Sequence, residues 1–160
     1  MTESCFSFVP MNEEFAHDIV SWHYEGMYAF YDMSADKEDL QIFMNREYWE
    51  DFFRAVVDEQ GSLVGWATFY SEKDEFWLSL GLRPDLTGQG LGIDFVGACV
   101  EYAKSNYDIS NGIIKLAVAE FNERAAKVYR RIGFHVCDRE TRDTHIGQVP
   151  FIVMEKTVTN

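Results

Sequence analysis

The chain has 160 residues, of which 47% are hydrophobic and 26% charged, with 3 prolines and 11 glycines. This composition is typical of one globular domain and excludes long disordered or low-complexity segments. No apolar run approaches the roughly 20 residues that cross a bilayer, and the N-terminus lacks the pattern of a signal peptide. We therefore expect a cytoplasmic protein with no membrane partner. Its three cysteines, Cys5, Cys99 and Cys137, are expected to be reduced thiols.

Charge divides the chain into two unlike halves. In total, 27 acidic and 14 basic residues give a net charge of −13. This excludes nucleic acid as a partner, because phosphate binding needs clustered Lys and Arg. Residues 1–80 carry 17 acidic and 4 basic residues, whereas residues 81–160 carry 10 of each. The asymmetry predicts halves that face different ligands, with the acidic half suited to a cation. The alternative is that the acidic residues only keep the surface soluble.

The first half predicts a strand, an aromatic helical region and a strand meander. Residues 5–11 alternate briefly between apolar and polar, as in a strand, and residues 12–31 indicate one or two helices with irregular ends. Two β-rich runs, 55–57 and 63–70, flank a short polar connection that contains glycine and therefore predict a hairpin. A third run, 75–82, follows a charged turn.

The second half alternates helices and strands. Apolar residues from Leu91 onward lie on one helical stripe, and residues 112–119, which are apolar apart from Lys115, are typical of a buried strand. A second helix is expected between Asn122, a favoured N-cap, and Gly133, which tolerates positive φ. Residues 134–158 hold two more short strand candidates. This element order predicts an α/β sandwich with a mixed, mostly antiparallel sheet flanked by helices.

The segment 80–92 (LGLRPDLTGQGLG) combines a strand, a proline turn and alternating glycines that open directly into a helix. Glycines let successive backbone N–H groups point inward, and the helix N-terminus adds positive potential, so the segment predicts a phosphate cradle. A dinucleotide fingerprint would need glycine at Ile93 or Phe95, and a P-loop would need a Gly-Lys pair, which is absent. These failures disfavour a dinucleotide-dependent oxidoreductase.

Two blocks carry a resemblance to the GNAT N-acetyltransferases. The run 87–92 (TGQGLG) resembles the family's coenzyme A pyrophosphate loop, and a second block with Asn122, Ala126, Tyr129 and the Gly133–Phe134 pair resembles its other signature. The blocks have the family's order and spacing. The resemblance implies a single domain over residues 1–160 with about seven strands, in which 1–54 form the acceptor side and 55–160 the coenzyme-binding core.

The resemblance also implies roles for individual residues. Tyr129 would give a proton to the departing thiolate, and the Leu82 N–H would face the thioester carbonyl as an oxyanion donor. The residues implied in coenzyme binding are Leu80, Gly81, Leu82, Thr87, Gly88, Gln89, Gly90, Leu91, Gly92, Ile93, Asn122, Lys127 and Tyr129. Two positions depart from the family pattern: Thr87 stands where Arg or Gln is usual, and Ala117 where many relatives carry Glu.

The acceptor side is expected in the aromatic N-terminal third, at Trp22, Tyr24, Glu25, Tyr28 and Tyr31. Aromatic rings with acidic neighbours suit a cation, although the same aromatic residues are as compatible with a core. The amine must lose a proton before attack, and Glu75, Glu120 and Glu25 are the candidate bases. Tyr129 and the basic residues on its helix, Arg124, Lys127, Arg130 and Arg131, are also compatible with a core tyrosine and a solvated helix face.

These observations predict an acetyl-CoA-dependent N-acetyltransferase that acts on the primary amine of a basic acceptor (a small molecule, a polyamine or a lysine-like side chain) by direct attack in a ternary complex. The alternative is a catalytically silent acyl-CoA-binding sensor or interaction module on the same fold. No metal is expected, because the four histidines lack metal-ligand spacing. Dimerisation is common in the family, so a homodimer is an open alternative.

Overall fold

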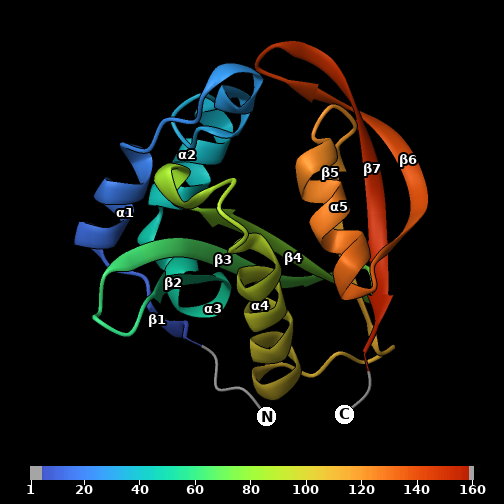
Figure 1. The fold of residues 1–160 in the computed structure, drawn as a ribbon, viewed down its shortest axis with the longest axis horizontal. Helices are drawn as coiled ribbons and strands as arrows, with labels where there is room; N and C mark the ends of the chain where they lie inside the picture. Colours follow the sequence, from blue (N-terminus) through green and yellow to red (C-terminus); the bar gives the residue numbers. More distant parts are fainter. Residues whose placement is uncertain (1–4, 159–160) are drawn as a thin grey trace.

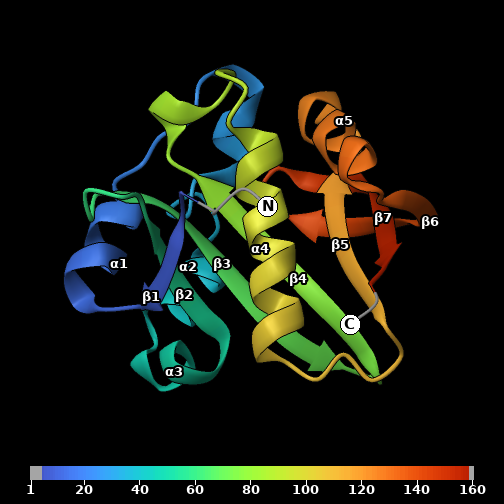
Figure 2. The same ribbon diagram turned by 60° about the horizontal axis from the view of Figure 1, so that its bottom comes forward.

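A computed structural model describes residues 5–158, which form a seven-stranded mixed sheet with helices on both faces (Figures 1 and 2). The sheet order is β1-β2-β3-β4-β5-β7-β6. The strands are β1 (Ser7–Pro10), β2 (Phe53–Val57), β3 (Leu63–Glu72), β4 (Glu75–Leu82), β5 (Ile113–Ala119), β6 (His135–Thr144) and β7 (Gly147–Thr157). The predicted α/β architecture is confirmed. No helix within residues 5–158 is long and apolar enough to span a membrane.

Helices cover the two faces with separate hydrophobic cores (Figure 2). The helices are α1 (Glu13–Val20), α2 (Lys37–Met44), α3 (Trp49–Phe52), α4 (Gly92–Asn106) and α5 (Glu123–Ile132), with 3₁₀ helices η1 (Gly26–Tyr31), η2 (Arg46–Tyr48) and η3 (Pro84–Leu86). Helices α4 and α5 pack on one face around Phe95 and Cys99, whereas α1, α2 and α3 bury Ile19, Phe43 and Trp49 against the other. Successive side chains along each strand point to opposite faces of the sheet, so a single strand contributes residues to both cores.

The sheet is split between β4 and β5 (Figure 2). Strand β4 pairs with β3 in antiparallel fashion along its whole length, from Glu72–Glu75 to Gly65–Leu82. Its parallel pairing with β5 is limited to two positions, Phe76–Ile114 and Trp77–Lys115. Beyond Trp77 the two strands diverge, and the remainder of β4 therefore presents an open backbone edge.

Most element boundaries agree with the sequence predictions. Strand β4 spans the predicted residues 75–82, and α5 has Asn122 as its N-cap and Gly133 in the left-handed region (φ +113°) as its C-cap. Two features differ. Helix α2 is not predicted by the sequence pattern, since only Phe43 of its eight residues is buried and the apolar stripe is thin. The C-terminal strands are long rather than short, because the charged, exposed residues of β6 hide its alternation.

Candidate active site

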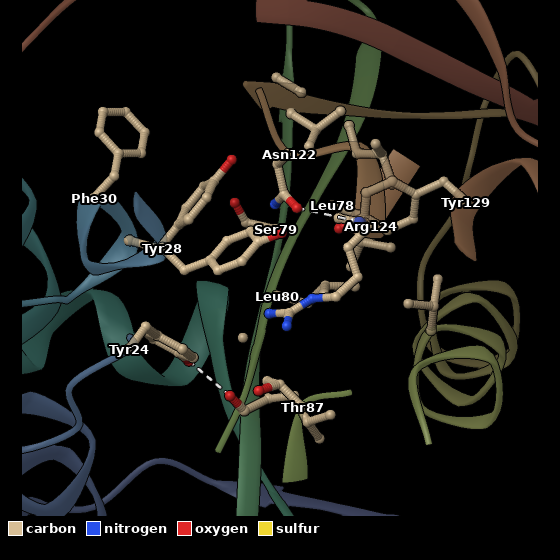
Figure 3. Close-up of a pocket in the computed structure, with 18 of the residues that line it drawn as sticks. Tyr24, Tyr28, Phe30, Leu78, Ser79, Leu80, Thr87, Asn122, Arg124 and Tyr129 are labelled. Atoms are coloured by element: carbon tan, nitrogen blue, oxygen red, sulfur yellow. Dashed lines mark hydrogen bonds between the residues drawn. The ribbon is translucent and has the colours of Figure 1, made fainter. Parts of the chain in front are cut away.

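The split in the sheet opens into a cleft of about 1210 Å³ (Figure 3). One end lies at the glycine loop between Thr87 and Gly92. The middle runs past the diverging strands β4 and β5, and the other end lies among η1, α2 and the turn between β6 and β7. The cleft therefore brings together the glycine loop, which the sequence assigns to the coenzyme, and part of the aromatic segment, which it assigns to the acceptor.

Backbone groups of β4 face the cleft at alternate residues. The Arg83 N–H donates to the Val64 carbonyl at 2.8 Å, so the backbone groups of Arg83 point toward β3. In an antiparallel pair the hydrogen-bonding direction alternates, so Leu82 and Leu80 direct their N–H and C=O groups away from β3, toward the split. The Leu82 carbonyl accepts a hydrogen bond from the Tyr24 hydroxyl at 2.7 Å (Figure 3). The N–H groups of Leu80 and Leu82 therefore face the cleft.

The glycine loop adopts the conformation that a phosphate cradle requires. Gly88 (φ +75°) and Gly90 (φ +80°) lie in the left-handed region, which other residues rarely adopt. The loop leads into α4, a helix of 15 residues whose N-cap, Leu91, makes no side-chain capping bond. Its first N–H groups and the positive end of its dipole are therefore available to an anion. Gly92 allows close packing on α5, since a Cβ there would lie 3.3 Å from Val128 Cγ2.

Helix α5 places Asn122 and Tyr129 beside the split. The Asn122 side chain accepts a bond from the Ala125 N–H at 3.2 Å and lines the cleft. Tyr129 is buried, and within residues 5–158 its hydroxyl has no hydrogen-bond partner. Burial first, and then the neighbouring Tyr31 and Cys99, raise the pKa of Tyr129 above its usual value. Its hydroxyl therefore keeps its proton at neutral pH.

Cationic side chains of α5 also line the cleft. The Arg124 guanidinium extends into the middle of the cleft and lies 4.1 Å from the centre of the Tyr28 ring (Figure 3). Lys127, Arg130 and Arg131 also line the cleft. An open strand edge, a glycine loop at an uncapped helix start and these cations fit the amide arm and phosphates of acetyl-CoA.

The predicted acceptor residues divide between the cleft and the core. Tyr24, Tyr28 and Tyr31 line the cleft, whereas Trp22 is buried in the core beneath α1 and Glu25 is exposed outside the lining. Tyr31 accepts a bond from the Ala119 N–H of β5 at 3.2 Å. The aromatic segment is thus both pocket wall and core, the two alternatives that the sequence leaves open.

A group of carboxylates lies at the end of the cleft where the sequence predicts the acceptor. The cleft-lining members are Asp32, Asp36, Glu38, Asp39 and Asp143. Partial burial, followed by the charges of Asp36 and Glu38, raises the pKa of Asp39 above its usual value, and His145 opposes this shift. His145 Nδ1 lies 3.9 Å from Asp36 Oδ2. The sequence does not single out these residues, although the acidic excess of the first half indicates a cation-binding region.

Trp66 is a further cleft residue that the sequence does not identify. It lies opposite Gly81 in the β3–β4 register, and a Cβ on Gly81 would approach the Trp66 Nε1 to 2.3 Å. The β4 alternation also directs the Gly81 N–H and C=O toward β3 rather than into the cleft. Gly81 therefore makes room for the indole ring, and the backbone edge that faces the cleft belongs to its neighbours, Leu80 and Leu82.

Four other predicted residues lie outside the cleft lining. Gln89 Nε2 donates to the Asp85 carbonyl at 2.6 Å within the loop, and the Leu91 carbonyl accepts the first backbone bond of α4. Glu75 is paired with Lys115 at 3.0 Å, and Glu120 with Arg139 at 3.0 Å. Within residues 5–158, no group of three or more His, Cys, Asp or Glu side chains is arranged to hold a metal ion.

The sheet topology, the split between two parallel strands and the glycine loop at a helix N-terminus define an acetyltransferase fold. A model of the Acetyltransferase (GNAT) family matches residues 16–134, and the chain belongs to this family. No curated protein matches the sequence.

Solved structures share the fold at low identity. Spermidine N-acetyltransferase from Vibrio cholerae, solved with CoA and spermine, aligns with a TM-score of 0.73 and 16% identity over 96% of this chain and 95% of that chain. Ribosomal-protein-S5-alanine acetyltransferase from Vibrio fischeri aligns with a TM-score of 0.64 and 14% identity over 100% of this chain and 97% of that chain. At such identities the likeness establishes the fold, and substrate assignment depends on the site itself.

Proposed function

We propose that the protein transfers an acetyl group from acetyl-CoA to the primary amine of a basic acceptor, bound together with the donor in one cleft. The observation that carries this proposal is the split sheet, because it joins an anion cradle at one end to an aromatic and acidic wall at the other. The acceptors of this class are a polyamine, another small amine or a lysine-like side chain.

The coenzyme end uses backbone groups more than side chains. The open edge at Leu80 and Leu82 would pair with the amides of the pantetheine arm as an added strand pairs with a sheet. The N–H groups of residues 88–93 would hold the pyrophosphate. Asn122 would orient the arm, and Lys127 and Arg124 would neutralise phosphate charge. Thr87 stands where the family pattern has a cation or an amide, and these helix α5 cations compensate for that departure.

The acceptor end favours a positively charged molecule. Aromatic rings near the end of η1, Phe30 and Tyr31, attract an ammonium through their faces. Burial and then the charges of Asp36 and Glu38 raise the pKa of Asp39, and a bound cation would stabilise this group of carboxylates. The Vibrio cholerae enzyme with this fold binds spermine. These points together support a polyamine or a similar amine as the acceptor.

When bound, acetyl-CoA supplies an acetyl group on a thioester, which an uncharged amine attacks. The N–H groups of the β4 edge, with Leu82 foremost, stabilise negative charge that develops on the carbonyl oxygen, usually the largest contribution in acyl transfer. The Tyr129 hydroxyl donates its proton to the leaving sulfur. Glu75 and Glu120 are engaged in ion pairs elsewhere, so we place the acceptor of the amine proton among the cleft-lining carboxylates.

Thermal unfolding followed by a turnover assay tests the proposal. A ligand at 100 times its Kd stabilises by about 2.7 kcal/mol, so acetyl-CoA and CoA should each raise Tm by several degrees, whereas NADH and ATP should not. Thiol release should then require acetyl-CoA and an amine from a panel of spermidine, spermine and lysine peptides. Absence of any shift with acetyl-CoA would overturn the proposal. A shift without thiol release from any amine would favour the sensor alternative.

A further inference from the structure

Arg124 reaches across the cleft without an acidic partner (Figure 3). The residue belongs to the first turn of α5, beside the glycine loop, and its guanidinium carbon lies 4.1 Å from the centre of the Tyr28 ring on η1. None of the ion pairs within residues 5–158 includes Arg124. The stacking on Tyr28 is therefore the contact that holds this charge in the middle of the cleft.

The guanidinium of Arg124 lies between the glycine loop and the open edge of β4. A Cβ on Gly88 would lie 3.9 Å from Arg124 Nη1, so one side of the guanidinium borders the loop. Burial raises the pKa of Tyr24, whose hydroxyl is bonded to the Leu82 carbonyl, and the nearby positive charge of Arg124 opposes this shift. A coenzyme with its pyrophosphate on residues 88–93 and its arm along the β4 edge must pass between these groups. The guanidinium therefore occupies the proposed path of the coenzyme.

We infer that Arg124 makes amine binding depend on the coenzyme: in the free protein it covers the cleft-facing side of the Tyr28 ring, and on coenzyme binding it moves to the phosphates and uncovers that ring for the ammonium group of the acceptor. The inference rests on the proposed function, since it concerns the same two ligands in the same cleft. A planar guanidinium binds a phosphate through two parallel charge-assisted hydrogen bonds. These bonds are stronger than stacking on one ring that water can reach, so the phosphates draw the side chain away from Tyr28.

The acceptor proposed for this cleft is itself a cation and therefore competes with Arg124. In the free protein an ammonium group meets a like charge and a ring that is already covered. In the coenzyme complex the phosphates neutralise Arg124, and the uncovered Tyr28 ring adds to the aromatic wall formed by Phe30 and Tyr31. The coenzyme thus raises the affinity for the amine, and by linkage the amine raises the affinity for the coenzyme by the same factor.

A fixed contact between the same two residues is the alternative arrangement. In that arrangement Arg124 stays on Tyr28, and the ring orients the guanidinium for the phosphate. Removing the ring separates the two, because a contact made only in the free protein opposes coenzyme binding. If Arg124 leaves the ring, Tyr28→Leu should bind CoA more tightly, by roughly two- to thirtyfold. If the contact is fixed, the same variant should bind CoA more weakly.

Isothermal titration calorimetry with CoA and spermidine tests the inference, since CoA in place of acetyl-CoA prevents turnover. In the wild type, saturating CoA should lower the Kd for spermidine at least about fivefold. In Arg124→Gln the ring is uncovered from the start, so saturating CoA should no longer change the Kd for spermidine. Lys127→Gln is the matched control, because it removes a cleft-lining cation of the same helix that stacks on no ring within residues 5–158. It should weaken CoA binding and keep the coupling.

Two results would overturn the inference and leave the proposed function standing. One is weaker CoA binding by Tyr28→Leu, and the other is equal coupling between CoA and spermidine in the wild type and in Arg124→Gln. Arg124 is exposed and Tyr28 is partly exposed, so both variants should fold like the wild type. If spermidine binds no form of the protein, the CoA affinity of Tyr28→Leu still decides. A wild type that does not bind CoA would instead overturn the proposed function, and the inference with it.

Discussion

Replacing Gly81 by Ala probes the contact that shapes the middle of the cleft. A Cβ at this position would lie 2.3 Å from Trp66 Nε1, 2.7 Å from Cε2 and 3.0 Å from Cζ2. All three atoms belong to a rigid indole ring, so a small side-chain adjustment does not relieve the overlap. Either the ring turns away from β4 or the two paired strands separate locally.

The expected cost follows from this overlap. Overpacking by one methyl group destabilises a protein by about 1–3 kcal/mol. For a chain of this size 1 kcal/mol lowers Tm by roughly 2–4 °C, and a central value of about 2 kcal/mol corresponds to roughly 6 °C. Because Trp66 lines the cleft, the KM for the amine should also rise.

Differential scanning calorimetry and steady-state kinetics measure these effects against a matched control. Gly97 lies within α4 with no neighbour within 4 Å of an added Cβ, so Gly97→Ala should raise Tm slightly through helix propensity. In a Trp66→Phe background, Gly81→Ala should cost less, because the smaller ring leaves room. An unchanged Tm together with an unchanged amine KM in Gly81→Ala would refute the assigned contact.

Other perturbations address the chemistry and the burial of ionisable groups. Tyr129→Phe should lower kcat by about a hundredfold and leave the Kd for CoA unchanged in calorimetric titration, and an unchanged kcat would remove Tyr129 from the mechanism. Gly90→Val should weaken CoA binding at least about tenfold, because a β-branched residue does not tolerate φ +80°, and retained affinity would contradict the cradle. Burial raises the pKa values of Tyr129, Tyr24 and Cys99 in the folded state. Their protons are released on unfolding at high pH, so the free energy of unfolding should begin to fall above about pH 9, where the Cys99 thiol ionises in the unfolded chain, and fall more steeply above about pH 10, where the tyrosines do. A flat urea-unfolding profile over this range would contradict this assignment.

The sequence predicts those parts of the fold that depend on local pattern. The cap residues Asn122 and Gly133 bracket α5 because side-chain capping and positive φ are properties of single residues. The apolar run of β4 is likewise recognisable without its neighbours. Helix α2 escapes prediction because its exposed face, with Lys37, Glu38 and Asp39, dominates its short sequence.

The remainder of the site depends on contacts between distant segments. The resemblance assigns Gly81 to coenzyme binding, but the need for glycine arises from Trp66 in the adjacent strand, which no local pattern reveals. The Tyr24–Leu82 bond joins residues 58 positions apart. Glu75 is a reasonable candidate base by charge alone, yet parallel pairing of β4 with β5 brings Lys115 beside it. Tertiary structure therefore selects among chemically equivalent carboxylates.

Two tyrosines connect the aromatic wall of the cleft to the two strands that border the split. Tyr24 precedes η1 and donates to Leu82 on β4, whereas Tyr31 ends η1 and accepts from Ala119 on β5. The segment between them therefore bridges the split and is tied to both of its sides. Acyl transfer requires the attacking and reacting atoms to be held in a narrow range of positions. Under the proposed function the same strands would position the acetyl donor and anchor the aromatic wall, so the width of the split would also set where the amine lies.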